Sequence, residues 1–160
     1  MDILGKEDTE LVKQWYHKST IDYFSAFVNL WIAFNAYYKQ FFPGIGGDHE
    51  KVRAICKDKK YIKIYDDLSN KNKLFCKNLE KLKEELEKKP LVDMKNKKPF
   101  GTYLGVISSI KKMEEVFEIL YGIRCNLFHG DKSLLDDRDK KLIEFAYNIL
   151  HDYMEKLVEE

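Results

Sequence analysis

Apolar residues recur at steps of three and four along most of this chain, which is the spacing of one face of an α-helix. The pattern predicts helices over residues 8–17, 21–42, 74–88 and 108–128, with a last helix that opens near Ser133. The sequence contains no alternating strand pattern of any length. The prediction is an all-α fold, an up-and-down bundle of four to five main helices.

Two of the expected helices carry unusual apolar faces. Residues 21–42 are apolar almost all round, which predicts the central helix of the bundle. Asn29 and Asn35 interrupt this surface, and as buried amides they are expected to tie neighbouring helices together. The first helix is expected to turn four apolar side chains inward, namely Leu11, Val12, Trp15 and Tyr16.

The end of the 108–128 helix concentrates polar chemistry. Arg124 lies within the apolar stripe of this helix, so its guanidinium must snorkel, find a partner or bear a desolvation cost. Asn126 and His129 continue a polar row on the opposite side of the helix, which begins with Glu115 and Glu118. This helix end therefore combines a cation in an apolar setting with an amide and an imidazole, a grouping typical of a functional site.

Gly122 lies inside the same helix, where a glycine costs about 1 kcal/mol relative to alanine. The usual reason for such a glycine is the close approach of another backbone or a ligand. A second copy of the chain is one candidate for that approach. Gly130 is expected to end the helix as its C-cap.

An arginine and a histidine suffice for metal-free RNA cleavage. His129 can take a proton from a nucleophile or return one to a leaving group, because an imidazole titrates near neutrality. The Arg124 guanidinium can bind a phosphate with two hydrogen bonds and stabilise the charge of a phosphorane. RNA supplies its own nucleophile, the 2′-hydroxyl, so the product is a cyclic phosphate. On a straight helix the two side chains lie about 140° apart, a gap that the length of arginine and the helix end narrow.

The length and net charge of the chain limit its domain number and the size of any nucleic-acid surface. With 160 residues, 44% of them hydrophobic and 34% charged, the chain fits one folded domain over residues 1–160. A net charge of +1 confines any nucleic-acid surface to a local patch. The candidates are the basic run Lys51–Lys63 and the run Lys95–Lys98, which is expected to be a linker or lid. Tyr61 and Tyr65, within the first run, are expected in the core rather than as stacking platforms for bases.

Several other function classes find no support. The three cysteines form no paired motif, and none of the four histidines has partners at ligand spacing, so no metal and no cofactor is expected. The glycine-rich segment 43–47 lacks the strand and the ending of a phosphate-binding loop. Residues 23–38 are too short and too polar in places to span a membrane. Without a visible signal peptide after Met1, the expected location is the cytoplasm.

The polar helix end resembles the R-x4-H motif of HEPN domains, with the sequence Arg124-Cys125-Asn126-Leu127-Phe128-His129 and a trailing Gly130. The segment 30–37 is similar to the aromatic helix of many bacterial and archaeal HEPN-like proteins. The resemblance implies a bundle that homodimerises through the motif helix, so that the motifs of both subunits meet in one cleft. It also implies metal-independent endoribonuclease activity, often in toxin–antitoxin or antiphage systems, with a nucleotidyltransferase-type antitoxin as a cognate partner.

In this resemblance Arg124 and His129 are the catalytic pair. Many members have a polar residue directly after the arginine, where this chain has Cys125, and Asn126 is expected to supply that polar group in a supporting role. Two other interpretations stay open. In one, the chain is a non-catalytic HEPN-like module that binds RNA, a nucleotide or a partner protein. In the other, Arg124 packs on Tyr121 or Phe128 as a cation–π pair and His129 caps the helix.

Overall fold

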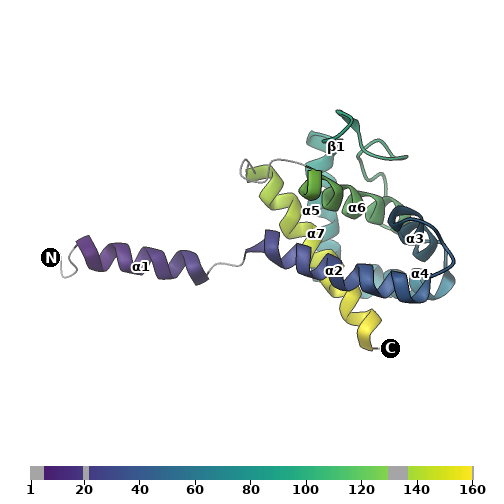
Figure 1. Ribbon diagram of the computed structural model, residues 1–160, viewed down its shortest axis with the longest axis horizontal. Coiled ribbons are helices and arrows are strands. Elements are labelled where there is room, and N and C mark those ends of the chain that lie inside the picture. The colour runs from purple at the N-terminus through teal and green to yellow at the C-terminus, as the bar shows by residue number, and fades with distance from the viewer. Residues whose placement is uncertain (1–5, 20–21, 130–136, 160) are drawn as a thin grey trace.

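The computed structural model describes residues 6–19, 22–129 and 137–159, without the side chains of 6–8, 17–19 and 129. These residues form seven α-helices and one pair of short antiparallel strands (Figure 1). The elements in chain order are α1 (Lys6–Ser19), α2 (Tyr23–Phe41), α3 (Asp48–Ile55), α4 (Lys59–Lys71), α5 (Lys73–Lys88), β1 (Val92–Asp93), β2 (Lys98–Pro99), α6 (Met113–His129) and α7 (Asp137–Glu159). The all-α class is confirmed, and α2, α4, α5, α6 and α7 are the long helices of the bundle.

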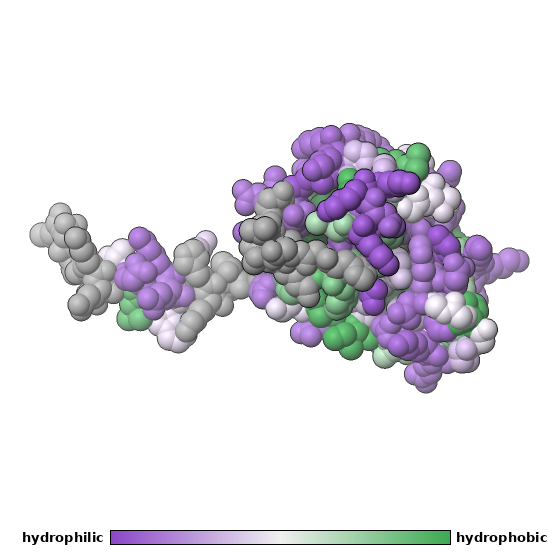
Figure 2. All heavy atoms as spheres, turned by 45° about the horizontal axis from the view of Figure 1, so that its top comes forward, coloured by the Kyte–Doolittle hydropathy of each residue, from purple (hydrophilic) through white to green (hydrophobic). Residues whose placement is uncertain are grey.

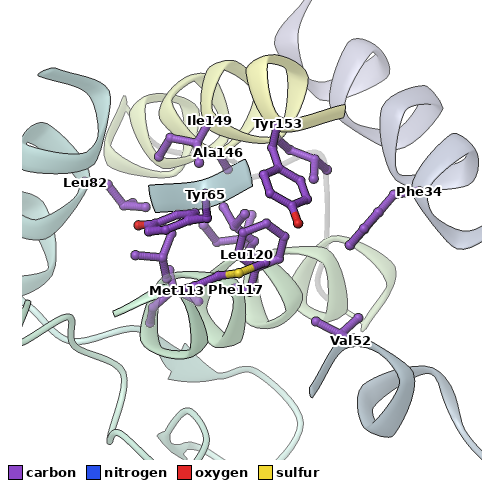
Figure 3. Packing of buried hydrophobic residues seen from close by; sticks show 14 of the residues in the cluster. Phe34, Val52, Tyr65, Leu82, Met113, Phe117, Leu120, Ala146, Ile149 and Tyr153 are labelled. Atoms are coloured by element: carbon purple, nitrogen blue, oxygen red, sulfur yellow. The ribbon is translucent and has the colours of Figure 1, made fainter. Parts of the chain in front are cut away.

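Helix α7 lies at the centre of the bundle and packs most extensively against α2 and α5. The core between α6 and α7 is aromatic, with the rings of Phe117 and Tyr153 5.0 Å apart in an edge-to-face arrangement (Figure 3). The tyrosine hydroxyls in this core find backbone acceptors. Tyr65 donates to the carbonyl of Ile110 at 2.5 Å, and Tyr153 donates to the carbonyl of Tyr61 at 3.1 Å. The core is therefore large and apolar, and these two buried hydroxyls are hydrogen-bonded.

Three of the predicted helices bury the side chains that their periodicity indicated. Helix α5 buries Leu79, Leu82 and Leu86 completely. The stripes of α6 and α7 are likewise buried over Met113, Phe117, Leu120, Leu127, Leu142, Ala146, Ile149, Tyr153 and Leu157. Helix α6 begins later than expected, at Met113. The Glu115 carboxylate accepts hydrogen bonds from the Ser108 hydroxyl and the Ser109 amide, which holds the preceding segment out of the helix.

The prediction for the first helix is wrong about its burial. Helix α1 lies away from the bundle (Figure 1), and its four large apolar side chains are exposed, at 53% for Leu11, 59% for Val12, 62% for Trp15 and 66% for Tyr16. Periodicity identified the amphipathic helix correctly. It could not say whether another part of the same chain covers its apolar face.

Helix α2 is also less buried than predicted. One stripe faces the core, formed by Phe27, Trp31, Phe34 and Tyr38, whereas the opposite side is open and leaves Ile32 60% exposed. Asn29 is exposed, and the Asn35 amide donates to the hydroxyl of Tyr38 on the same helix at 2.6 Å. Within the described residues neither asparagine therefore forms a hydrogen bond to a neighbouring helix, contrary to the prediction.

The segment 91–107 packs on α6 instead of forming a free linker. Strands β1 and β2 pair Val92 with Pro99 and Asp93 with Lys98. The turn between them carries the Lys95–Lys98 run, and Lys97 adopts a φ of 60° there. The expected linker or lid is thus a small hairpin with a defined place on the bundle.

Some expectations fall outside the described residues, namely the C-cap at Gly130 and the opening of the last helix near Ser133. Within the part of the chain that is described, none of the helices combines the length and the apolar character that a membrane span requires.

Candidate functional site

Arg124 occupies a partly open position near the end of α6, with 23% of its side chain exposed. Its guanidinium carbon lies 4.8 Å from the ring centre of Phe128 and 5.8 Å from that of Tyr121. The nearest carboxylate that pairs with it is Asp48 of α3, with 3.9 Å between Nη2 and Oδ2. Its Nε is buried, and among the described residues it has no hydrogen-bond partner. The arginine is thus held by aromatic faces, while much of its hydrogen-bonding capacity is unused.

The histidine of the motif ends the helix. Residue His129 is the last residue of α6, and its side chain lies outside the described part of the structure. Its backbone follows Arg124 by five residues, which is about 7.5 Å of helix rise. The helical continuity between the two motif residues therefore agrees with the sequence analysis.

Asn126 binds the hairpin with both ends of its amide. Its Nδ2 donates to the carbonyl of Val92 at 2.8 Å, and its Oδ1 accepts from the amide of Met94 at 3.0 Å. The expected supporting role in catalysis is untested by this geometry. The contacts assign Asn126 a structural role, because they fasten the β1 end of the hairpin to α6.

Gly122 explains why the hairpin can approach so closely. A Cβ at this position would lie 2.7 Å from both the Leu91 Cδ2 and the Phe100 Cδ1. The close approach inferred from the sequence therefore exists, but it comes from the same chain. Gly122 is buried and offers no surface to a second copy.

Helix α3 brings polar residues to the site that the sequence analysis did not connect with it. The His49 ring stacks on Tyr121 at 4.2 Å with 13° between the planes, and its Nε2 lies 2.8 Å from the Glu118 Oε1. Arg53 contacts the same carboxylate oxygen at 3.2 Å. Asp48, next to His49, faces Arg124. Two consecutive residues of α3 thus contact both the motif arginine and a buried acid on α6.

Glu118 is ionised in this arrangement. Burial alone would raise the pKa of its carboxyl, but the hydrogen bonds and charges of His49 and Arg53 outweigh burial and lower the pKa below its usual value. Burial also raises the pKa of the Tyr121 hydroxyl, to about 12, which leaves a neutral phenol beside Arg124 at ordinary pH. The site therefore combines a fixed cation, aromatic rings and a carboxylate that is already paired.

The polar row of α6 is not a solvated face. Glu115 and Glu118 are each only 4% exposed. The segment before α6 binds the first of them and α3 binds the second. A row of polar residues on a helix usually indicates a solvent-exposed face. Here α3 and the segment before α6 cover the row and form hydrogen bonds with its carboxylates. No sequence spacing could have signalled this, because His49 and Glu118 are 69 residues apart.

The basic run Lys51–Lys63 is partly used inside the fold. Lys51 is buried and its Nζ donates to the carbonyl of Ile45. Arg53 pairs with acids, as described above, so neither residue is available as a free phosphate contact. Tyr61 and Tyr65 are 5% and 0% exposed, which confirms their expected place in the core.

A cavity of about 460 Å³ lies beside this α3–α6 contact. Arg53, Lys57, Glu114 and Tyr103 are among its lining residues, and Cys56 forms part of its wall. Burial raises the pKa of the Cys56 thiol, so it stays protonated and unreactive. The cavity mixes both charge signs and points to no particular ligand.

The expectation that no histidine has partners at ligand spacing needs one correction. On α7, ligand atoms of His151, Asp152 and Glu155 lie within 4.8 Å of one another. His151 and Glu155 are exposed, and the group lies on the outside of the helix. This arrangement is common on charged helix surfaces and adds no chemistry to the Arg124 site.

No family model, curated protein or solved structure matches this chain. The likeness to HEPN domains therefore depends on the R-x4-H pattern and the aromatic helix, together with the all-α bundle in which they lie.

Proposed function

We propose that the protein is a metal-independent endoribonuclease of the HEPN type. The observation that carries the proposal is the Arg124 guanidinium, which is partly exposed at the end of α6 and has no carboxylate partner closer than 3.9 Å among the described residues. A guanidinium that a carboxylate already binds with two hydrogen bonds has little left for a phosphate. Arg124 retains that capacity, and Phe128 and Tyr121 restrict where it can point.

In this proposal the 2′-hydroxyl of RNA attacks the adjacent phosphorus, and His129 accepts its proton. A new bond forms between the 2′-oxygen and phosphorus, and the bond to the 5′-oxygen of the next nucleotide breaks. A proton returns to that leaving oxygen, and the products are a 2′,3′-cyclic phosphate and a 5′-hydroxyl. Arg124 stabilises the negative charge that builds up on the phosphoryl oxygens.

The proposal includes a homodimer in which the motifs of two subunits meet. Gly122 is buried, whereas Phe128 in the last turn of the motif helix is 47% exposed. A cytoplasmic location and an antitoxin of the nucleotidyltransferase type belong to the same proposal. The antitoxin is drawn from the resemblance alone, and the location is the expectation already given from the sequence.

A non-catalytic binding module is the second candidate, and a specific observation favours it. Asn126, the expected supporting residue, uses both ends of its amide to hold the hairpin. The site then offers a cation and aromatic rings, which suit RNA binding by phosphate contact and stacking, while the Asn126 amide is already used by the hairpin.

The test is cleavage of a mixed RNA pool by the purified full chain in EDTA. The variants are Arg124→Ala and His129→Ala, with His151→Ala as a matched histidine control on α7. The nuclease is supported when cyclic-phosphate ends form in EDTA, disappear in both motif variants and persist in the control.

Two outcomes contradict it. RNA binding without cleavage, lost in Arg124→Ala, supports the binding module instead. Equal cleavage by all variants means that a contaminating enzyme is responsible.

A further inference from the structure

The turn of the β1–β2 hairpin carries three lysines within four residues, namely Lys95, Lys97 and Lys98, which we call the lysine turn. All three are exposed, and within the described residues none of them forms an ion pair. The other basic run differs, because Lys51 and Arg53 are bound by groups of the fold itself. The lysine turn therefore concentrates positive charge that is available to an anion outside the chain.

Hydrogen bonds hold the backbone of this turn in one shape. The Asp93 carboxylate accepts from the Lys95 amide and from the Asn96 side chain, each at 2.9 Å. The Lys97 amide donates to the Asp93 carbonyl at 2.8 Å. Three lysines and one aspartate leave the turn with a net charge of +2. Because the backbone is already ordered, an anion that binds here does not have to bear the cost of ordering it.

Asn126 fixes the lysine turn at the end of α6. Its Oδ1 accepts from the amide of Met94, the residue directly before Lys95, and strand β1 contacts α6 (Figure 1). The position of His129 follows Asn126 by three residues, so it lies about 60° further around the helix, toward the same side. Arg124 lies about 200° away from Asn126, on the other side. The last turn of α6 is thus flanked by the motif arginine and by the lysine turn.

We propose that the lysine turn is a second RNA contact, which holds a single strand across the end of α6. This inference deepens the proposed nuclease and rests on RNA being its substrate. The reacting phosphate lies at Arg124, and phosphates further along the same strand lie at the lysine turn. The distance to be crossed is about one helix diameter, 10–12 Å, which a strand of a few nucleotides spans. The lysines bind phosphate as point charges, so they add affinity without selecting a base.

The character of the surface favours a nucleic acid over a protein partner. Figure 2, in which the top of Figure 1 comes forward, shows mainly hydrophilic residues on this part of the bundle. Interfaces with nucleic acids are more polar and more positively charged than those between proteins. The strand is single at this place, because an attack by the 2′-oxygen in line with the leaving 5′-oxygen needs a backbone free to turn, which a duplex restricts.

The test is the binding of the full chain to a strand of about twelve nucleotides, a length within the usual range of single-strand sites. The strand carries 2′-O-methyl groups, so it cannot be cut and its binding is measured separately from cleavage. Fluorescence anisotropy over a salt series gives the affinity and its salt dependence. The hairpin variant combines Lys95→Ala, Lys97→Ala and Lys98→Ala.

The control variant combines Lys71→Ala, Lys73→Ala and Lys77→Ala, which changes the net charge by the same amount. These lysines are also exposed and form no ion pair within the described part of the chain. They lie at or next to the start of α5, whereas the hairpin follows the other end of this helix. The two ends are about 24 Å apart, so the control lysines are far from the proposed contact.

We expect the hairpin variant to bind at least tenfold more weakly at low salt. Its slope of log affinity against log salt should fall by about 2, since each of three phosphate contacts on a single strand contributes about 0.7. The control variant should keep the affinity and the slope of the wild type. Thermal unfolding should be unchanged in both, because the changed side chains are exposed. The hairpin variant should also cut a dinucleotide at the wild-type rate, since that substrate is too short to reach from Arg124 to the turn.

Three results overturn the inference. They are a wild type that does not bind the strand at low salt, a hairpin variant that binds as tightly as the wild type, and an equal loss of binding in the hairpin and control variants. The last result would mean that net charge alone attracts the strand.

Failure of the nuclease is a separate result. Binding that depends on the lysine turn, without any cleavage of natural RNA, supports the contact and contradicts the catalytic proposal. Cleavage that the hairpin variant retains in full, with unchanged binding, does the reverse.

Discussion

Replacing Asn126 by alanine separates a structural from a catalytic role for this residue. The variant loses the hydrogen bonds to Val92 and to Met94, each worth about 1 kcal/mol net in a typical protein. Alanine recovers about 0.5 kcal/mol through its better helix propensity. The expected loss in the free energy of unfolding is therefore about 1.5 kcal/mol.

In a domain of this length that loss lowers the melting temperature by about 3–6 °C. Hydrogen exchange should speed up at the Met94 amide, because its acceptor is gone. Asn148→Ala on α7 is the matched control, since Asn148 is also half-buried and its side chain forms no hydrogen bond within the described residues. Its melting temperature should stay within about 1–2 °C of the wild type.

Thermal unfolding by circular dichroism, hydrogen exchange and RNA cleavage are measured on the same samples. An unchanged melting temperature and unchanged exchange at Met94 would refute the structural role. A loss of RNA cleavage at unchanged stability would instead support a catalytic role for Asn126.

Three further predictions concern the same helix and its surroundings. Gly122→Ala should lower the free energy of unfolding by up to about 2 kcal/mol in chemical denaturation. A Cβ there would lie 2.7 Å from two side chains, and this overpacking costs more free energy than alanine gains in helix propensity. Gly44→Ala, with open space around its Cβ, is the control and should change the stability little. Glu118 stabilises the fold above the pKa that it has in the unfolded chain, since its folded pKa is the lower one, and this contribution is lost as the pH falls through the folded value. Glu118→Gln should therefore flatten the acid side of a stability profile below the ordinary pKa of a glutamate, and a profile as steep as the wild type's would contradict the ion-pair account. Arg124→Lys keeps the charge but not the two-pronged geometry, so it should fold with a melting temperature close to the wild type's and lose most RNA cleavage, whereas full activity would exclude a bidentate phosphate contact.

Local periodicity was enough to predict much of this protein. The stripes of α5, α6 and α7 are buried as the spacing of their apolar residues indicated, because an amphipathic helix in a bundle must cover its apolar face. The position of Arg124 inside such a stripe was visible for the same reason. A glycine inside a helix lowers helix stability, so Gly122 also predicted the close approach of another segment, without indicating which one.

The tertiary structure decided which segments meet those helices. It assigned the approach at Gly122 to Leu91 and Phe100, and it covered the acids of α6 with α3 and the segment before the helix. It also left the apolar face of α1 exposed, although its pattern resembles that of a buried helix. Sequence spacing records which residues share a face of one element. It does not record which distant segment packs on that face, because the packing of the whole chain determines that choice.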